Sequence, residues 1–119
     1  MKENIIRDKC MNFAVRIVNL YRELVKQNKE YVVSKQILRA GTSIGANVVE
    51  SQHSISKKEF LAKIYIAFKE CAETKYWLEL LYKTEYISLD EYSSIMEDCN
   101  EIYRILAAIT KTTRETINS

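Results

Sequence analysis

Both glycines of the chain stand in one stretch with the apolar pattern of a helix, and this pair constrains the fold more than any other feature. Gly41 and Gly45 lie four residues apart within SKQILRAGTSIGANVVESQ, residues 34–52. At a helical pitch, both fall on the broad apolar side of that helix. An interior glycine costs about 1 kcal/mol relative to alanine, so the pair predicts a compensating close approach of another helix. The motif concerns packing and discloses no biochemical activity.

The composition indicates a single helical domain covering residues 1–119. The chain has no proline, 47% hydrophobic residues and 29% charged residues. This length provides one core but not two, and so few backbone breakers are atypical of a β-sandwich or a disordered chain. We therefore expect an all-α protein.

No apolar run approaches the roughly 20 residues needed to cross a bilayer, and the N-terminus has no signal-peptide pattern. These features favour a cytoplasmic protein. Cys10, Cys71 and Cys99 each occupy an apolar helical register, so we expect reduced core thiols rather than a disulfide or a catalytic group. His53 has no second ligand at suitable spacing and is expected at the surface. Neither a metal nor a cofactor is expected.

Apolar periodicity predicts four helices. The first covers about residues 4–26, and the glycine helix runs from a start between residues 28 and 34 to about residue 53. Ser56–Glu59 and Ser88–Glu91 match the capping box, so the third and fourth helices should begin at about Lys57 and Leu89. A hydrophobic staple is expected before each, from Ile55 with Phe60 and from Ile87 with Tyr92. Short links between four amphipathic helices favour an antiparallel up-down-up-down four-helix bundle.

The glycine helix and the third helix also carry a family resemblance. The matching residues are SKQILRA at 34–40, SIGANVVE at 43–50, KEF at 58–60, and the run from Ile66-Ala67 to Glu73-Thr74. This pattern resembles the 23S rRNA intervening-sequence proteins, also called S23 ribosomal proteins, in register from about Phe13 to Lys111. Members typically carry a Phe-Pro pair before the second helix, whereas residues 29–33 here contain no proline.

The resemblance implies a four-helix bundle that assembles into a homopentameric ring. Relatives include the accessory variability determinant of diversity-generating retroelements, which partners a reverse transcriptase and nucleic acid. Members encoded within ribosomal intervening sequences are suspected RNA binders, and the family is not known for enzymes. These properties are what the resemblance implies, and the residues themselves do not establish them.

Charge is unevenly distributed along the chain. Residues 1–29 contain seven Lys or Arg and three acids, a net charge of +4, whereas residues 87–119 contain three and six, a net charge of −3. Arg22, Lys26 and Lys29 form a row away from the apolar stripe of the first helix, and Lys9 and Arg16 flank that stripe. Such a row can contact phosphates, but it can equally be a solvated face with a favourable cationic C-terminus.

The glycine helix adds Lys35 and Arg39 to the candidate set. Arg39 lies off the apolar face, so a phosphate contact and an intersubunit ion pair with Glu50 or another acid are both open. The candidate nucleic-acid-binding residues are therefore Arg16, Arg22, Lys26, Lys29, Lys35 and Arg39. Five copies in a ring would multiply a weak patch into a continuous basic surface.

Four apolar residues of the third helix project opposite its core stripe: Ala62, Ile66, Trp77 and Leu80. Exposed apolar patches mark protein contacts, and tryptophan is enriched at interfaces, so these residues are the candidate oligomer interface. The alternative is that Trp77 covers the end of its own bundle. The eight tyrosines are dispersed through core registers, and a base-stacking platform is not expected.

No catalytic residue is predicted, because the chain has no phosphate-binding glycine loop, nucleophile elbow or metal-ligand cluster. The first hypothesis is a non-enzymatic homo-oligomer that binds structured RNA or DNA, with 23S rRNA as the family-implied ligand. The second is a protein-interaction adaptor for a nucleic-acid enzyme such as a reverse transcriptase. No membrane partner is expected.

Overall fold

Four helices account for nearly all of the chain. A computed structural model describes residues 2–118, and its helices are α1 (Lys2–Lys26), α2 (Val33–Ser51), α3 (Lys57–Lys83) and α4 (Leu89–Asn118). Within these described residues there is no β-strand. The all-helical prediction is confirmed, as are the starts of α3 and α4 at Lys57 and Leu89. The start of α2, which the sequence left open, lies at Val33.

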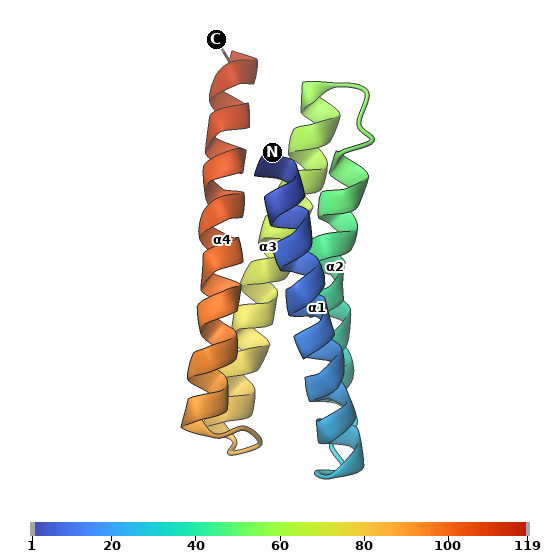
Figure 1. The fold of residues 1–119 in the computed structure, drawn as a ribbon, viewed down its shortest axis with the longest axis vertical. Coiled ribbons are helices and arrows are strands. Elements are labelled where there is room, and N and C mark those ends of the chain that lie inside the picture. Colours follow the sequence, from blue (N-terminus) through green and yellow to red (C-terminus); the bar gives the residue numbers. More distant parts are fainter. Residues whose placement is uncertain (1, 119) are drawn as a thin grey trace.

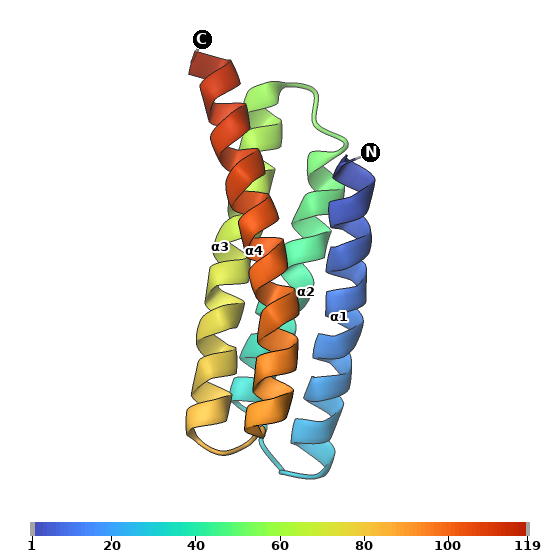
Figure 2. The same cartoon turned by 60° about the vertical axis from the view of Figure 1, so that its left-hand side comes forward.

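The helices lie side by side along a long axis and measure 50 × 22 × 21 Å together (Figures 1 and 2). In Figure 1 the α1–α2 and α3–α4 connections lie at the lower end, and the α2–α3 connection lies at the upper end. Contacts are extensive between α1 and α2, α2 and α3, and α3 and α4, but much sparser between α1 and α4. None of these helices has an apolar segment long enough to traverse a bilayer.

The glycines of α2 are the points of closest approach to α1. A Cβ atom added to Gly41 would lie 2.8 Å from Cγ1 and 2.9 Å from Cγ2 of Ile17. A Cβ atom on Gly45 would lie 3.2 Å from Cβ of Cys10. The first spacing is shorter than real side chains tolerate, so the absence of a side chain is what allows Ile17 to pack there. The close-approach prediction is confirmed, and α1 is the partner helix.

The core is a continuous apolar cluster to which all four helices contribute. Its largest fully buried side chains include Ile6, Phe13, Ile17, Leu24, Ile37, Ile44, Ile64, Leu78, Leu81, Ile102 and Leu106. Burying such side chains is the main favourable contribution to folding, at roughly 1.5–3 kcal/mol for each fully buried Leu, Ile or Phe.

The three cysteines are buried free thiols, as predicted. Cys71 of α3 and Cys99 of α4 meet with their Sγ atoms 3.8 Å apart. Burial, with a smaller contribution from neighbouring Cys71, raises the pKa of Cys10 to about 12. The hydrogen bond to Cys71 and then burial raise the pKa of Cys99 as well. These two thiols are therefore protonated at neutral pH and act as small apolar residues.

Serine side chains cap α3 and α4, but only one of the two expected staples can form. Ser56 Oγ accepts a hydrogen bond from the Glu59 N–H at 3.0 Å, and Ser88 Oγ accepts one from Glu91 at 3.1 Å. Ile87 is buried in the core. Ile55 is 93% exposed, so the predicted Ile55–Phe60 staple is wrong. The loop before α3 projects Ile55 away from the bundle.

A glutamate two residues before the N-cap position starts α2. The Glu30 carboxylate accepts hydrogen bonds from the N–H groups of Val32, Val33 and Ser34, at 3.1, 3.0 and 2.6 Å. Val32, at the N-cap position, has no side chain that could accept them. The preceding Lys29 adopts a left-handed conformation with φ of 54°, which turns the chain at the end of α1. Glu30 thus satisfies the backbone donors that a Ser or Thr cap would satisfy elsewhere.

Replacing Gly41 with alanine should destabilise the protein, because the new methyl group overlaps a β-branched side chain close to its backbone. Overpacking of this kind costs about 1–3 kcal/mol, against roughly 1 kcal/mol gained in helix propensity. Chemical denaturation should show a net loss for Gly41→Ala and a change within about 1 kcal/mol for Gly45→Ala. In an Ile17→Ala background the Gly41→Ala loss should disappear. An equal loss in both backgrounds would contradict the packing explanation.

Glu30 should make stability depend on pH. Partial burial acts to raise the pKa of Glu30, but the hydrogen bonds from Ser34, Val33 and Val32 together outweigh it and hold the pKa below its usual 4.5. A carboxylate with a lowered folded-state pKa stabilises above its unfolded-state pKa, and that contribution is lost as pH falls through the folded-state value. Glu30→Gln should therefore cost about 0.5–1 kcal/mol at pH 7, typical of a helix cap.

The loss caused by Glu30→Gln should shrink in acid, because protonated glutamate resembles glutamine. Denaturation curves at neutral pH and at pH values below 4 would measure the difference. Glu23→Gln is the matched control, since Glu23 is an exposed carboxylate on α1. A loss of constant size across pH would contradict the capping role.

Candidate nucleic-acid interface

Arg16 joins α1 to the acidic helix α4. Its Nη1 lies 2.8 Å from Asp98 Oδ2, and its two Nη atoms also donate to the carbonyl and hydroxyl oxygens of Ser94. About two turns earlier on α1, Lys9 Nζ lies 3.1 Å from Glu101 Oε2. The positive charge on one edge of α1 is thus matched by negative charge on α4. Arg16 already has an acidic partner within its own chain.

Arg39 joins α2 to α3 in the same manner. Its Nη1 lies 3.0 Å from Glu70 Oε2, and its Nη2 is paired with Glu73. Glu73 in turn accepts a hydrogen bond of 2.9 Å from the indole N–H of Trp77. Of the two roles the sequence left open for Arg39, the structure contains an ion pair, but with acids of its own subunit. Glu50 pairs instead with Lys63 of α3, at 3.0 Å.

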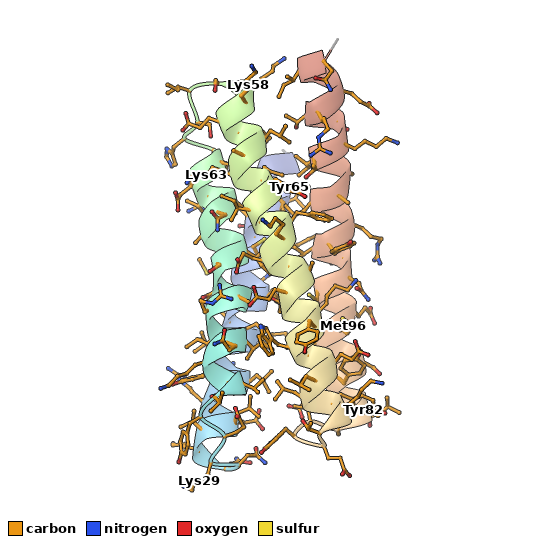
Figure 3. All side chains as sticks on the ribbon, turned by 180° about the vertical axis from the view of Figure 1, so that it is seen from behind. Lys29, Lys58, Lys63, Tyr65, Tyr82 and Met96 are labelled. Carbon is orange, nitrogen blue, oxygen red and sulfur yellow. The ribbon has the colours of Figure 1, made fainter. Side chains whose placement is uncertain are left out.

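The other four candidate cations lie exposed at the α1–α2 end of the bundle. Arg22 and Lys26 are on the last turns of α1, Lys29 is in the loop, and Lys35 is in the first turn of α2. Figure 3 shows Lys29 at the tip of this end. Among residues 2–118, none of the four has an ion pair. We call Arg22, Lys26, Lys29 and Lys35 the α1–α2 cations.

Acidic residues confine this basic surface to one side of the bundle end that carries the α1–α2 connection. Glu23 is exposed on α1 beside Arg22, and Glu30 is occupied in capping α2. The α3–α4 connection lies at the same end of the molecule, and Asp90 and Glu91 begin α4 there. The basic surface is therefore a corner formed by α1 and α2 rather than the whole end.

The candidate oligomer residues of α3 differ in exposure. Ala62 and Ile66 are exposed, and Ile66 has 41% of its surface accessible. Leu80 and Trp77 are half-buried, and Trp77 also packs against the core of its own bundle. Trp77 thus covers its own subunit, which was the alternative the sequence left open. The apolar surface that remains available on α3 is centred on Ile66.

A cluster of aromatic and basic residues between α3 and α4 was not predicted from the sequence. Tyr65 is 41% exposed, and its ring lies 6.2 Å from that of Phe68, which is 4.8 Å from Tyr103. Not one of the eight tyrosines is fully buried. Tyr82, Tyr92 and Tyr103 pack against the core, as expected of core registers, whereas Tyr65 is an exception. Tyr65, Lys69 and Arg114 are visible in the sequence. They can be recognised as one cluster only when α3 is known to pack against α4.

In the part of the chain that the structure describes, no three metal-binding side chains converge. His53 lies exposed in the turn after α2. The thiols of Cys71 and Cys99 are enclosed in the core.

The family model of the 23S rRNA-intervening sequence proteins matches residues 2–108. A crystal structure from Bacteroides thetaiotaomicron, described as a protein of unknown function from the S23 ribosomal protein family, is 55% identical to this chain. The two superpose with a TM-score of 0.91 over 93% of this chain and 99% of the other. No functionally curated protein matches the chain. A family match over nine-tenths of the residues, with a close structural relative, assigns the chain to the 23S rRNA-intervening sequence protein family.

Proposed function

We propose that this protein is a non-enzymatic, homo-oligomeric helical bundle that binds structured nucleic acid through the phosphates. RNA is the favoured ligand because the family takes its name from an intervening sequence of 23S rRNA. Such a ligand would place the protein in the cytoplasm. The contacts are assigned to Arg22, Lys26, Lys29 and Lys35.

The observation that supports this assignment is the contrast among the candidate cations. Arg16 and Arg39 are paired with acids of neighbouring helices, whereas the α1–α2 cations have no ion pair among residues 2–118. Releasing Arg16 or Arg39 to a phosphate would leave Asp98 or Glu70 without its partner. The α1–α2 cations carry no such cost, so they can exchange counterions for phosphates directly. Arg16 and Arg39 are therefore proposed as structural residues.

The proposal includes an up-down-up-down bundle as the subunit of a homopentameric ring. One subunit contributes only four exposed cations at this corner, which is few for stable nucleic-acid binding. Five copies on one face would act together, because each further contact becomes intramolecular. The exposed Ile66 and Ala62 on α3, with half-buried Leu80 nearly four turns further along the same helix, are the proposed subunit contact.

A protein partner, such as a reverse transcriptase, is the second candidate function. Ile66 and the 59% exposed Tyr76 give the outer surface of α3 an apolar character that another protein can cover. In this case the protein would act as an adaptor and would touch nucleic acid only through its partner.

Replacing Arg22, Lys26 and Lys29 together with glutamine should weaken binding to a structured ribosomal RNA fragment and reduce its salt dependence. The slope of log K against log salt should fall by about three per subunit engaged, because each lysine or arginine on a phosphate releases about one counterion. Electrophoretic or fluorescence titration at several salt concentrations would measure the slope.

The matched control replaces Arg7, Lys57 and Lys58, which are exposed at the opposite end of the bundle. It removes the same net charge from a different surface. If both triple variants lower the slope equally, the α1–α2 cations are not the contact site. Binding that is independent of salt, or absent in the unmodified protein, would overturn direct phosphate recognition and favour the adaptor.

Self-association should depend on Ile66. In sedimentation velocity at several concentrations, the unmodified protein should be an oligomer, and Ile66→Lys should shift it to smaller species because a charge cannot be buried unpaired in a subunit contact. Ile55→Lys, at an equally apolar but loop-borne and exposed position, should leave the oligomer intact. A persistently monomeric unmodified protein would exclude the ring. An oligomer unaffected by Ile66→Lys would place the contact elsewhere.

A further inference from the structure

The groove between α3 and α4 combines an exposed aromatic surface with cations that have no acidic partner in the described part of the chain. Tyr65, Phe68 and Tyr103 form a row of three rings along the groove, joined by centroid distances of 6.2 and 4.8 Å. Figure 3 shows Tyr65 on the side of α3 that faces α4. Phe68 and Tyr103 are half-buried and anchor the row to the core, whereas Tyr65 presents much of its ring to solvent.

The cations of this groove are held over aromatic rings rather than against carboxylates. Lys69 Nζ lies 5.8 Å from the centroid of Tyr65, and the Arg114 guanidinium lies 5.7 Å from the same ring. Lys75 Nζ lies 4.1 Å from the centroid of Tyr103. Within residues 2–118, none of these three cations has an ion pair. Cation–π attraction of about 0.5–1 kcal/mol at exposed sites leaves them available to an anionic ligand.

The upper part of the groove is large enough to hold a nucleotide. A hollow of about 710 Å³ lies between the helices, and its lining includes Tyr65, Phe68, Ala107, Lys111 and Arg114. This volume falls within the roughly 300–1,000 Å³ typical of small-ligand sites. The charged residues of the lining are Lys111, Arg114 and Glu115, so the hollow is largely apolar with a small excess of positive charge.

We infer that the α3–α4 groove binds an unpaired stretch of nucleic acid, with one base stacked against Tyr65. Lys69, Lys111 and Arg114 would contact the flanking phosphates. The inference rests on the proposed nucleic-acid-binding function and specifies the part of the ligand that this second surface takes. Duplex nucleic acid offers phosphates but no free base face, so an aromatic row within a basic groove favours a loop, bulge or single-stranded end.

The two surfaces then have separate roles. The α1–α2 cations have one exposed aromatic residue among them, Tyr31, but no aromatic row, and they are assigned to the charged backbone. The α3–α4 groove adds stacking, which depends on an unpaired base but tolerates its identity, since every base has a π face. An RNA that contains both a helix and a loop would engage both surfaces.

The test compares Tyr65→Leu, Tyr65→Phe and Tyr76→Leu, using a fluorescent oligouridylate and a blunt-ended RNA duplex of equal length, which has no unpaired base. Tyr76 is the matched control because it is an exposed tyrosine of the same helix whose ring packs on Trp77, with centroids 5.1 Å apart, and not in the groove. Tyr65→Leu should weaken oligouridylate binding by about 5-fold or more, the loss expected for one stacked base. Tyr65→Phe and Tyr76→Leu should bind as the unmodified protein does.

A second variant tests the phosphate contacts without altering the aromatic row. Arg114→Gln should lower the salt slope for oligouridylate by about 0.7, the value for one phosphate contact on a single strand. Ultraviolet cross-linking of bound oligouridylate, followed by peptide mass spectrometry, should map to Tyr65 or Phe68. Thermal unfolding followed by circular dichroism would verify that each variant is folded.

The outcomes separate this inference from the proposed function. If the duplex is bound and the Arg22, Lys26 and Lys29 variant lowers its salt slope, while Tyr65→Leu and Arg114→Gln leave oligouridylate binding unchanged, the groove inference is overturned and the proposed function stands. If the unmodified protein binds neither RNA, the proposed function fails and the inference fails with it. If Tyr65→Leu changes the oligomeric state, a neighbouring subunit covers the groove and the inference is overturned.

Discussion

The close contact of α1 with the two glycines of α2 sets the geometry of the bundle. Ile17 packs where the Cβ atom of Gly41 would be, and Cys10 packs against Gly45 one turn away. This contact sets the position of α1 along α2. In that position the apolar side of α1 enters the core, and its polar edge faces α4. Two interior glycines weaken α2 as an isolated helix, so tertiary packing must compensate for roughly 2 kcal/mol of lost helix propensity.

With α1 held by α2, two ion pairs connect its polar edge to α4. Lys9 with Glu101 and Arg16 with Asp98 join these two helices, whose backbones approach each other over a much shorter stretch than those of the other neighbouring pairs. Each exposed ion pair of this kind contributes little to the free energy of unfolding. Together, the two pairs show that the facing edges of α1 and α4 carry opposite charges. Part of the charge asymmetry between the two ends of the sequence is therefore neutralised by contacts between α1 and α4 of the same subunit. A net charge of +4 on the first 29 residues overstates what is available to an external ligand.

The sequence predicted those features that depend on local spacing. The capping serines, the helical registers of the core and the apolar side of the glycine helix all lie within a few residues of one another, so one sequence was sufficient. The Glu30 cap was missed because a glutamate two residues before the N-cap position is not among the usual capping patterns, although it explains how α2 starts without proline.

The candidate site was less predictable, because its properties depend on residues far apart in the chain. Arg39 and Arg22 look alike in the sequence, and only the position of Glu70 on α3 distinguishes the paired cation from the unpaired one. The aromatic groove has the same origin, since Tyr65 and Arg114 are brought together only by the packing of α3 against α4. Ile55 shows the converse error, in which a valid local pattern was overruled by the path of a loop.

The buried thiols give the protein a built-in reporter of its own opening. Cys10 and Cys99 are protonated at neutral pH and sealed from solvent, so an alkylating reagent can reach them only in molecules whose helices have separated. The rate of thiol alkylation therefore measures how often the bundle opens, without any added label. Slower alkylation in the presence of RNA would indicate that the ligand binds the closed bundle in preference to the open one.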